Sequence, residues 1–366
     1  MLRSLSSLRF SPSRRLVGAV LGVLASTVGA SAQSIYALED QAQLVHHIRF
    51  DARLLRFERD PSQARSVGNL DWEAPRLRGS LGASSDGRWI FVGRENGLVV
   101  LSRAADGSLE PVAGSPLGGI GRVLGVASRT RLGRTAIFAT EQIFGVVRTF
   151  DADARTGVVA MREGWVPAGT PGGATCLALS RRLLCVLNTV DRAIYVFDID
   201  PFNATLTAWP LNPFPLPVWT SAPTQLIVDA QETSVLVNDA SSSRCGVLDI
   251  DVRARELRYP REVPTLHAAP AQLVDFRRNG RTLFVAGSAG LQLFDGELRS
   301  NGAAPLPFAA LEDLALDPRE RGLFVASARS LSYVPLDRRS SMPSPDLGRM
   351  LRDAFTTQAM ALVVVR

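Results

Sequence analysis

The sequence predicts an all-β protein folded as a seven-bladed β-propeller of four-stranded antiparallel blades. Three observations carry this prediction. Short apolar segments recur every 40 to 51 residues, Asp-Gly and Asn-Gly turns lie between them, and the two ends of the chain supply complementary parts of one blade. Many short strands joined by such turns, repeated at that period, are typical of propellers. We expect residues 33–366 to form this single domain.

Residues 1–32 are predicted to be a signal peptide. They combine four arginines and no acid with the apolar stretch Leu16–Ala30 and the small residues Ala30-Ser31-Ala32. This order of basic, apolar and small residues predicts export to the periplasm or the extracellular space, with cleavage after Ala32. The apolar stretch is short for a membrane-spanning helix, so an uncleaved anchor is the weaker alternative.

Residues 81–118 contain one complete blade. Its turns are expected at Asp86-Gly87, Asn96-Gly97 and Asp106-Gly107, because these dipeptides favour tight hairpins. Its four strands are expected at Leu81–Ala83, Trp89–Val92, Leu98–Leu101 and Leu109–Val112. The aspartates that follow several third strands, as in Phe150-Asp151 and Phe197-Asp198, are expected to begin turns by accepting bonds from their own backbone.

The second strand of this blade has equivalents along the chain. Their central positions are 91, 138, 185, 236, 284 and 324, which gives spacings of 47, 47, 51, 48 and 40 residues. Residues 34–58 supply the second, third and fourth strands of a further blade, and Gln358–Val365 supplies its first strand. Pairing the N- and C-terminal strands would close the ring and leave no open sheet edge.

The charge balance argues against a nucleic-acid partner. All 41 basic residues are arginines, against 35 acids, and the net charge is +6. Removing the four arginines of the leader lowers it to +2, and the remaining arginines are scattered among acids instead of forming one patch. A polyanion-binding protein would need a concentrated basic surface.

The blade at residues 81–118 resembles those of lactonase-type seven-bladed propellers, the 6-phosphogluconolactonase-like proteins and the related YVTN repeats. The matching residues are Ser85-Asp86-Gly87-Arg88, Ile90-Phe91-Val92, Asp106–Val112 and Gly114-Ser115-Pro116. The resemblance implies a propeller fold and hydrolysis of a lactone. No catalytic signature of those enzymes matches a stretch of this chain.

The predicted ligand site lies where the loops after second strands and the connections between blades gather around the central channel. Arginine is suited to a carboxylate by its forked guanidinium, and amides and acids suit hydroxyl groups. The candidate ligand-binding residues are Arg94, Glu95, Asn96, Arg122, Asn188, Asn238, Arg244 and Arg329. Polar loops that only face solvent are the alternative.

Lactone hydrolysis requires a base for water and a donor for the developing oxyanion. The candidate catalytic residues are His267, in a connection between blades, and the acids Glu141 and Asp239. The other two histidines, His46 and His47, are adjacent on a strand, so they are expected to point to opposite faces.

No metal or nucleotide cofactor is predicted, because the sequence has no metal-binding or glycine-rich phosphate motif. A calcium site built from Glu39, Asn188, Asn238 and Asp239 has no motif to support it. Cys176 and Cys185 are expected on adjacent strands around a turn at Ser180-Arg181, which would place them opposite each other. They form either a cross-strand disulfide or two buried thiols.

Two functions follow from the sequence. The first is an exported bacterial binding or interaction module that presents the loops around its channel to a small ligand or a protein partner. The second is a lactone hydrolase, a carboxylic-ester hydrolase acting on an unphosphorylated sugar or carboxylate lactone. The missing catalytic signature and the scarcity of histidine favour the first, and the sequence leaves enzymatic activity undecided.

Overall fold

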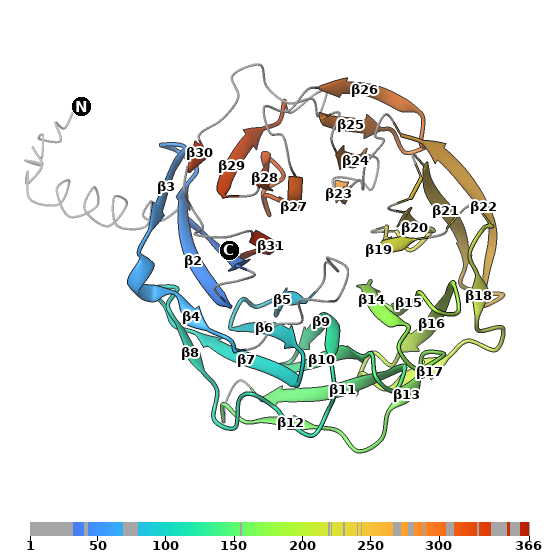
Figure 1. The fold of residues 1–366 in the computed structure, drawn as a ribbon, viewed down its shortest axis with the longest axis horizontal. Helices are drawn as coiled ribbons and strands as arrows, with labels where there is room; N and C mark the ends of the chain where they lie inside the picture. The colour runs from blue at the N-terminus through green and yellow to red at the C-terminus, as the bar shows by residue number, and fades with distance from the viewer. Residues whose placement is uncertain are drawn as a thin grey trace, which may run out of the picture.

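The computed structural model shows a ring of antiparallel sheets around a central axis (Figure 1). It describes residues 32–39, 43–68, 80–153, 156–218, 220, 222–229, 231–239, 241–242, 244–265, 272–276, 282–287, 290–304, 311–327, 329–337, 350–351 and 359–365. Within these residues the regular structure is β-strand apart from one short 3-10 turn, η1 (Pro61–Gln63). Seven sheets are present, and the predicted seven-bladed β-propeller is confirmed.

The seven blades are lettered A to G in chain order, and each runs from an inner strand to an outer one. Blade A comprises β31 (Ala359–Val365), β1 (Ala32–Glu39), β2 (Leu44–Asp51) and β3 (Arg56–Arg59), with β4 (Arg65–Ser66) also paired to β2. Blade B comprises β5 (Leu81–Ala83), β6 (Trp89–Arg94), β7 (Gly97–Arg103) and β8 (Leu109–Pro111). Blade C comprises β9 (Val123–Arg131), β10 (Arg134–Glu141), β11 (Val146–Asp153) and β12 (Val159–Met161), with β13 (Val166–Pro167) on β11.

The remaining blades follow the same order. Blade D comprises β14 (Ala174–Leu179), β15 (Leu183–Asn188), β16 (Ala193–Ile199) and β17 (Leu206–Ala208), with β18 (Phe214–Pro215) on β16. Blade E comprises β19 (Pro223–Val228), β20 (Ser234–Asp239), β21 (Arg244–Asp251) and β22 (Glu256–Pro264). Blade F comprises β23 (Gln272–Phe276), β24 (Thr282–Gly287), β25 (Gly290–Phe294) and β26 (Ser300–Ala304). Blade G comprises β27 (Leu311–Leu316), β28 (Gly322–Ser327), β29 (Ser330–Pro335) and β30 (Met350–Leu351).

Blade A contains strands from both ends of the chain. β31 pairs antiparallel with β1, with Ser34 opposite Val365 and Ala37 opposite Leu362. The inner strands β31, β5, β9, β14, β19, β23 and β27 contact one another in this order, and β27 contacts β31 in turn (Figure 1). The predicted leader, up to residue 31, lies outside the described residues. Within them, no helix has the length and apolar character to cross a membrane.

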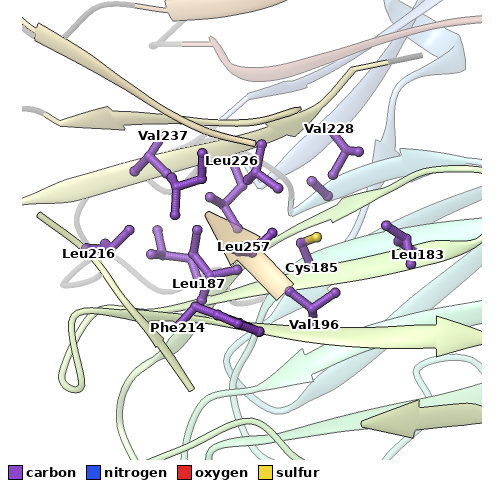
Figure 2. Close-up of a cluster of buried hydrophobic side chains, with 14 of the residues drawn as sticks. Leu183, Cys185, Leu187, Val196, Phe214, Leu216, Leu226, Val228, Val237 and Leu257 are labelled. Atoms are coloured by element: carbon purple, nitrogen blue, oxygen red, sulfur yellow. The ribbon is translucent and has the colours of Figure 1, made fainter. Parts of the chain in front are cut away.

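The hydrophobic core is divided among the seams between neighbouring blades. Each of the seven clusters of buried apolar side chains joins two adjacent blades. Figure 2 shows the seam between blades D and E, where Leu183, Cys185 and Leu187 of β15 face Leu226 and Val228 of β19. Burying each such side chain contributes roughly 1.5–3 kcal/mol.

The second strands are apolar on both faces because each blade lies between two neighbours. On β6, Ile90 and Val92 pack in the seam with blade A, whereas Trp89 and Phe91 pack in the seam with blade C. Successive side chains of a strand point to opposite faces. The run Trp89–Val92 is therefore continuous in hydrophobicity, like the equivalent runs in the other blades.

An aromatic cluster fills the seam between blades G and A. The Phe50 ring on β2 lies 5.1 Å from Phe324 of β28 and 4.4 Å from Tyr333 of β29, measured between ring centroids. Phe57 on β3 packs against Phe50 at 4.8 Å. Since blade A contains both ends of the chain, this cluster links the terminal strands to the last complete blade.

The turn aspartates were predicted two residues too early in blades C, D and E and correctly in blade F, where Oδ1 of Asp295 accepts from the backbone N–H of Glu297 and Arg299. Oδ1 of Asp200 accepts bonds from the backbone N–H of Phe202 and Asn203, while Asp198 accepts from the indole N–H of Trp209. Asp151 instead accepts a bidentate pair of bonds from Arg162 at 2.7 and 2.6 Å. The third strands are longer than expected, so Asp151 and Asp198 lie within a strand and not in the turn after it.

The expected opposition of Cys176 and Cys185 is wrong by two residues. Cys176 lies opposite Leu187, and Cys185 lies opposite Ala178. The reason is the turn, where the backbone N–H of Ser180 bonds to the carbonyl of Leu183 and centres the hairpin on Arg181-Arg182. Moving the centre by one residue shifts every cross-strand partner by two. All three cysteines are free and buried, which corrects the disulfide alternative.

We predict that Phe50→Ala lowers the free energy of unfolding by about 3–5 kcal/mol. The substitution opens a cavity inside a packed seam, and the surrounding side chains cannot move in to fill it. Leu54→Ala is the matched control in the same blade, since Leu54 is 67% exposed. Urea unfolding of both variants measures the difference. Equal effects would contradict the assignment of the aromatic cluster to the core.

We predict that Ellman's reagent labels no thiol in the native protein at pH 8. Burial raises the pKa of Cys176 to about 11 and that of Cys185 and Cys245 to about 12, so little thiolate is present. Unfolding without reductant should release three reactive thiols per chain. Release of a single thiol would show a disulfide instead.

Candidate functional site

The predicted site belongs to the end of the propeller at which the chain passes between blades. We call this end the connection face; it carries the connections into the inner strands and the turns between second and third strands. The opposite end, the hairpin face, carries the turns between first and second strands and between third and fourth strands. Antiparallel pairing places these two sets of turns at opposite ends of every blade.

Five polar residues singled out in the sequence occupy one repeated position of the fold. Each is the last residue of its blade's second strand, and we call them the strand-end residues. They are Glu39 of β1, Arg94 of β6, Glu141 of β10, Asn188 of β15 and Asp239 of β20. Except for Arg94, which is half-buried, they are fully buried.

Glu141 bonds to the connection that enters its own blade. Its Oε1 accepts from the backbone N–H of Gly121 at 2.8 Å, and its Oε2 accepts from Nε of Arg148 at 2.5 Å. Arg148 also lies over the ring of Trp165, 5.0 Å from its centroid. A carboxylate that is removed from water is stable here because each of its oxygens has a donor, a backbone N–H for Oε1 and a charged guanidinium for Oε2.

Asn188 has the same role in blade D. Its Nδ2 donates to the carbonyls of Ala168 and Thr170 at 2.9 and 3.1 Å, and its Oδ1 accepts from the backbone N–H of Asp191. Asp191 in turn accepts from the backbone N–H of Thr170 and from the hydroxyl of Tyr195. The amide therefore joins the incoming connection to the turn that follows its strand.

Asp239 and Arg94 also bond to the backbone of the connections that enter their blades, E and B. Asp239 accepts from this backbone, whereas Arg94 donates to it. The Oδ2 of Asp239 accepts from the backbone N–H of Ala222 at 2.9 Å, and its Oδ1 accepts from the backbone N–H of Ser241. Nη1 of Arg94 donates to the carbonyl of Val67 at 3.2 Å. Buried backbone groups in the connections must be paired, and the strand-end residues pair them.

Glu39 has a histidine as its partner. Its Oε2 lies 2.5 Å from Nε2 of His46, while Nδ1 of that ring lies 3.2 Å from Nη2 of Arg59. Arginine can only donate, so Nδ1 is the acceptor and Nε2–H donates to Glu39. Burial lowers the pKa of His46, although the bond to Glu39 opposes that shift, so the ring is neutral at pH 7.

The remaining candidates are distributed around the ring. Nη1 of Arg122 donates to Oε1 of Gln142 at 3.2 Å. Asn238 is buried and donates to Thr224. Glu95 is half-buried, and Asn96, Arg244 and Arg329 are exposed; Arg244 forms an ion pair with Glu262. His267 lies outside the described residues.

The two predicted catalytic acids do not bond to each other, and the third predicted catalytic residue, His267, lies outside the described residues. Glu141 is in blade C and Asp239 is in blade E, and among the described residues neither bonds to the other or to Arg94. The same holds for the calcium hypothesis, since its four residues come from blades A, D and E. The described residues contain no group of three or more His, Cys, Asp or Glu side chains suited to a metal ion.

An apolar surface on the connection face was not predicted from the sequence. Large apolar side chains are exposed at the turns and connections of blades C and D, and we call them the apolar rim. They are Ile143, Phe144, Val190 and Val218, with exposed fractions of 52, 59, 56 and 93%. These residues lie between strands, in turns and connections, so a search of the sequence for apolar residues within the predicted turns would have found them.

Hydrogen bonds join the turns and connections that carry the apolar rim. The backbone N–H of Gly172 donates to the carbonyl of Gln142, and that of Thr189 donates to the carbonyl of Gly173. Nη2 of Arg192 donates to the carbonyl of Val218 at 2.9 Å. The turns of blades C and D and the connections beside them are thus ordered around exposed apolar groups.

A groove of about 630 Å³ lies on the hairpin face between blades E and F. Its charged groups bond within the chain: Arg261 pairs with Asp249 at 2.7 Å, and Asp229 accepts from the backbone N–H of Thr233 and Ser234. This groove is remote from the predicted site, because it lies at the other end of the blades.

Comparison with known proteins identifies the fold. No family model matches the sequence, and no curated protein matches it. Among solved structures, a candidate 6-phosphogluconolactonase of Bacteroides fragilis is 12% identical with a TM-score of 0.67, covering 92% of this chain and 98% of that one. The periplasmic gluconolactonase of Pseudomonas aeruginosa is 18% identical with a TM-score of 0.65, covering 92% and 99%.

A protein from Lactobacillus plantarum is also similar, at 14% identity and a TM-score of 0.70, covering 92% of this chain and all of that one. Identities this low establish the shared fold and not a shared activity. The class of protein is therefore a seven-bladed β-propeller of lactonase-like architecture, as the blade at residues 81–118 led us to expect.

We predict that Glu141→Ala lowers the free energy of unfolding by about 3 kcal/mol, because it leaves the Arg148 charge and the Gly121 N–H without their acceptor. Glu110→Ala is the control, since Glu110 pairs with Arg65 but is 62% exposed and should cost about 1 kcal/mol or less. Chemical denaturation compares the two. A loss for Glu141→Ala no larger than that of the control would contradict the structural role.

Proposed function

We propose that this protein is an exported binding module that presents its connection face to a small ligand or a protein partner. The observation that carries the proposal is the condition of the strand-end residues. Glu141 and Asp239, the acids that would serve as bases, are buried and hold the connections through hydrogen bonds. A general base must instead reach the proton of a water or a substrate.

The apolar rim supports binding at the same face. The apolar rim is exposed on turns and connections that hydrogen bonds keep ordered. Binding a partner there would therefore cost little conformational entropy in this protein. Exposed apolar side chains on the surface of a folded protein are typical of interaction sites. The predicted leader supports export, and the similar Pseudomonas aeruginosa structure is of a periplasmic protein.

Lactone hydrolysis is the second candidate, favoured by the likeness to structures described as lactonases. The general base would be His267, or Glu141 or Asp239 after its hydrogen bond to the connection breaks. The oxyanion that develops on the substrate would be stabilised by an arginine such as Arg94.

We predict that the protein lacking residues 1–32 does not hydrolyse a panel of unphosphorylated sugar and carboxylate lactones above the rate in buffer. The reason is that the strand-end acids bond within the fold. A pH-stat assay measures acid release, with Arg94→Ala and His267→Ala tested beside the unaltered protein. Turnover that either substitution abolishes would overturn the binding proposal in favour of the hydrolase.

We predict that Phe144→Asp abolishes capture of a partner from the periplasmic or extracellular fraction, whereas Phe202→Asp does not. Phe202 is 83% exposed but lies on the hairpin face, which makes it the matched control. Quantitative pull-down with each variant compares the captured protein. Equal capture by both variants would place the binding surface elsewhere.

A further inference from the structure

Two large apolar side chains protrude from the hairpin face on neighbouring blades, and we call them the hairpin tips. Leu132, in the turn between β9 and β10 of blade C, is 93% exposed. Phe202, in the turn between β16 and β17 of blade D, is 83% exposed. Blades C and D lie side by side in the ring (Figure 1). Neither side chain belongs to a cluster of the hydrophobic core, so the core does not account for them.

Arg131 holds the two turns together. Its Nη1 donates to the carbonyl of Pro201, and its guanidinium carbon lies over the ring of Phe202, 4.9 Å from the centroid. Leu132 follows Arg131 directly in the chain. The hairpin tips therefore protrude from one joined pair of turns, and Arg131 serves to fix the turns relative to each other.

The backbone at Leu132 is unfavourable for a leucine. Arg131 pairs with Arg134, which leaves Leu132 and Gly133 as a two-residue hairpin loop with φ of 49° and 76°. Such a loop favours asparagine or glycine, because other side chains crowd the backbone in the left-handed region. An exposed apolar side chain in this conformation gains almost nothing from internal packing. Its presence there indicates a contact outside the chain.

Exposed arginines lie beside the hairpin tips. Arg134 ends the loop that carries Leu132, and Arg181 lies in the turn between β14 and β15, the other hairpin of blade D on this face. Both are exposed, and neither forms an ion pair among the described residues. Guanidinium groups remain charged at physiological pH and donate readily to phosphate oxygens.

The carboxylates near these turns are held by bonds within the chain. Glu232 is buried and pairs with Nε of Arg182 at 2.5 Å. Oδ1 of Asp200 accepts from two backbone N–H groups of its own turn, and its charge is offset by two arginines of β9. Oδ1 of Asp153 likewise accepts from a backbone N–H of its turn. The surface around the hairpin tips is therefore apolar and basic.

We propose that the hairpin tips dock this protein on the surface of an anionic lipid bilayer. Leu132 and Phe202 would enter the boundary between headgroups and acyl chains, and Arg134 and Arg181 would lie at the level of the lipid phosphates. A bilayer suits convex tips, because fluid lipids close around a protruding side chain. A protein partner would instead need two pockets that match them.

This docking goes beyond the proposed function and does not depend on it. The hairpin tips and the apolar rim lie at opposite ends of the blades. A protein docked through its tips would turn the connection face away from the bilayer, toward a ligand or partner in solution. The predicted export would carry the chain across a membrane and leave it facing that membrane's outer surface.

The test is co-sedimentation of the protein lacking residues 1–32 with vesicles of phosphatidylcholine and phosphatidylglycerol in equal parts, and with vesicles of phosphatidylcholine alone. We expect binding to the anionic vesicles, weakened about fivefold in Arg134→Gln by the loss of one charge. Leu132→Asn should weaken binding about tenfold, because it removes an inserted apolar side chain. Asparagine suits the backbone at Leu132, so the thermal midpoint of this variant should not fall.

Leu211→Asn is the matched control and should bind like the unaltered protein. Leu211 is 56% exposed between β17 and β18, at the outer edge of blade D and away from the hairpin tips. No binding to the anionic vesicles, or equal binding by Leu132→Asn and the unaltered protein, would overturn the proposal. Equal binding to both kinds of vesicle would refute the preference for an anionic surface. Capture of another protein through Leu132 without any vesicle binding would assign the tips to a protein partner instead.

Discussion

Every blade of this protein has two apolar faces, and each face needs a neighbour to cover it. Ile90 and Val92 point to one side of β6 while Trp89 and Phe91 point to the other, and no single sheet could shield both sets from water. A row of such blades would leave an apolar face at each end. The ring removes that problem because the seam between blades G and A, with Phe50 and Phe324, is packed like the others.

Packing the seams places a demand on the backbone at the connection face. The described parts of the connections into blades B, C, D and E pass over the edge of a seam, where their N–H and C=O groups lose water. The strand-end residues answer this demand with whichever group the connection requires: an acceptor in Glu141 and Asp239, and a donor in Arg94 and Asn188. Variation in residue type at one repeated position therefore reflects the polarity of the backbone group that each one meets.

The same principle explains which residues remain for function. Side chains that bond to the connections stabilise the fold and are not free to bind a ligand. Side chains at the outer tips of turns and connections, such as Phe144 and Val218, are exposed and contribute nothing to any seam.

The sequence by itself determined the repeat, the strand content and the position of nearly every second strand, because apolar runs and Asp-Gly turns depend on local chemistry. It also separated His46 from His47, since alternation along a strand is a local rule: the first bonds to Glu39 and the second to Ser34 and Gln63. Only the tertiary structure decided the register of the hairpin that holds Cys176 and Cys185. A turn moved by one residue changes every partner, and turn sequence alone does not set its centre. The tertiary structure likewise decided that Glu141 and Asp239 hold connections, because their partners Gly121 and Ala222 are brought to them by the register of the first and second strands, in which Val123 lies opposite Glu141 and Pro223 opposite Asp239.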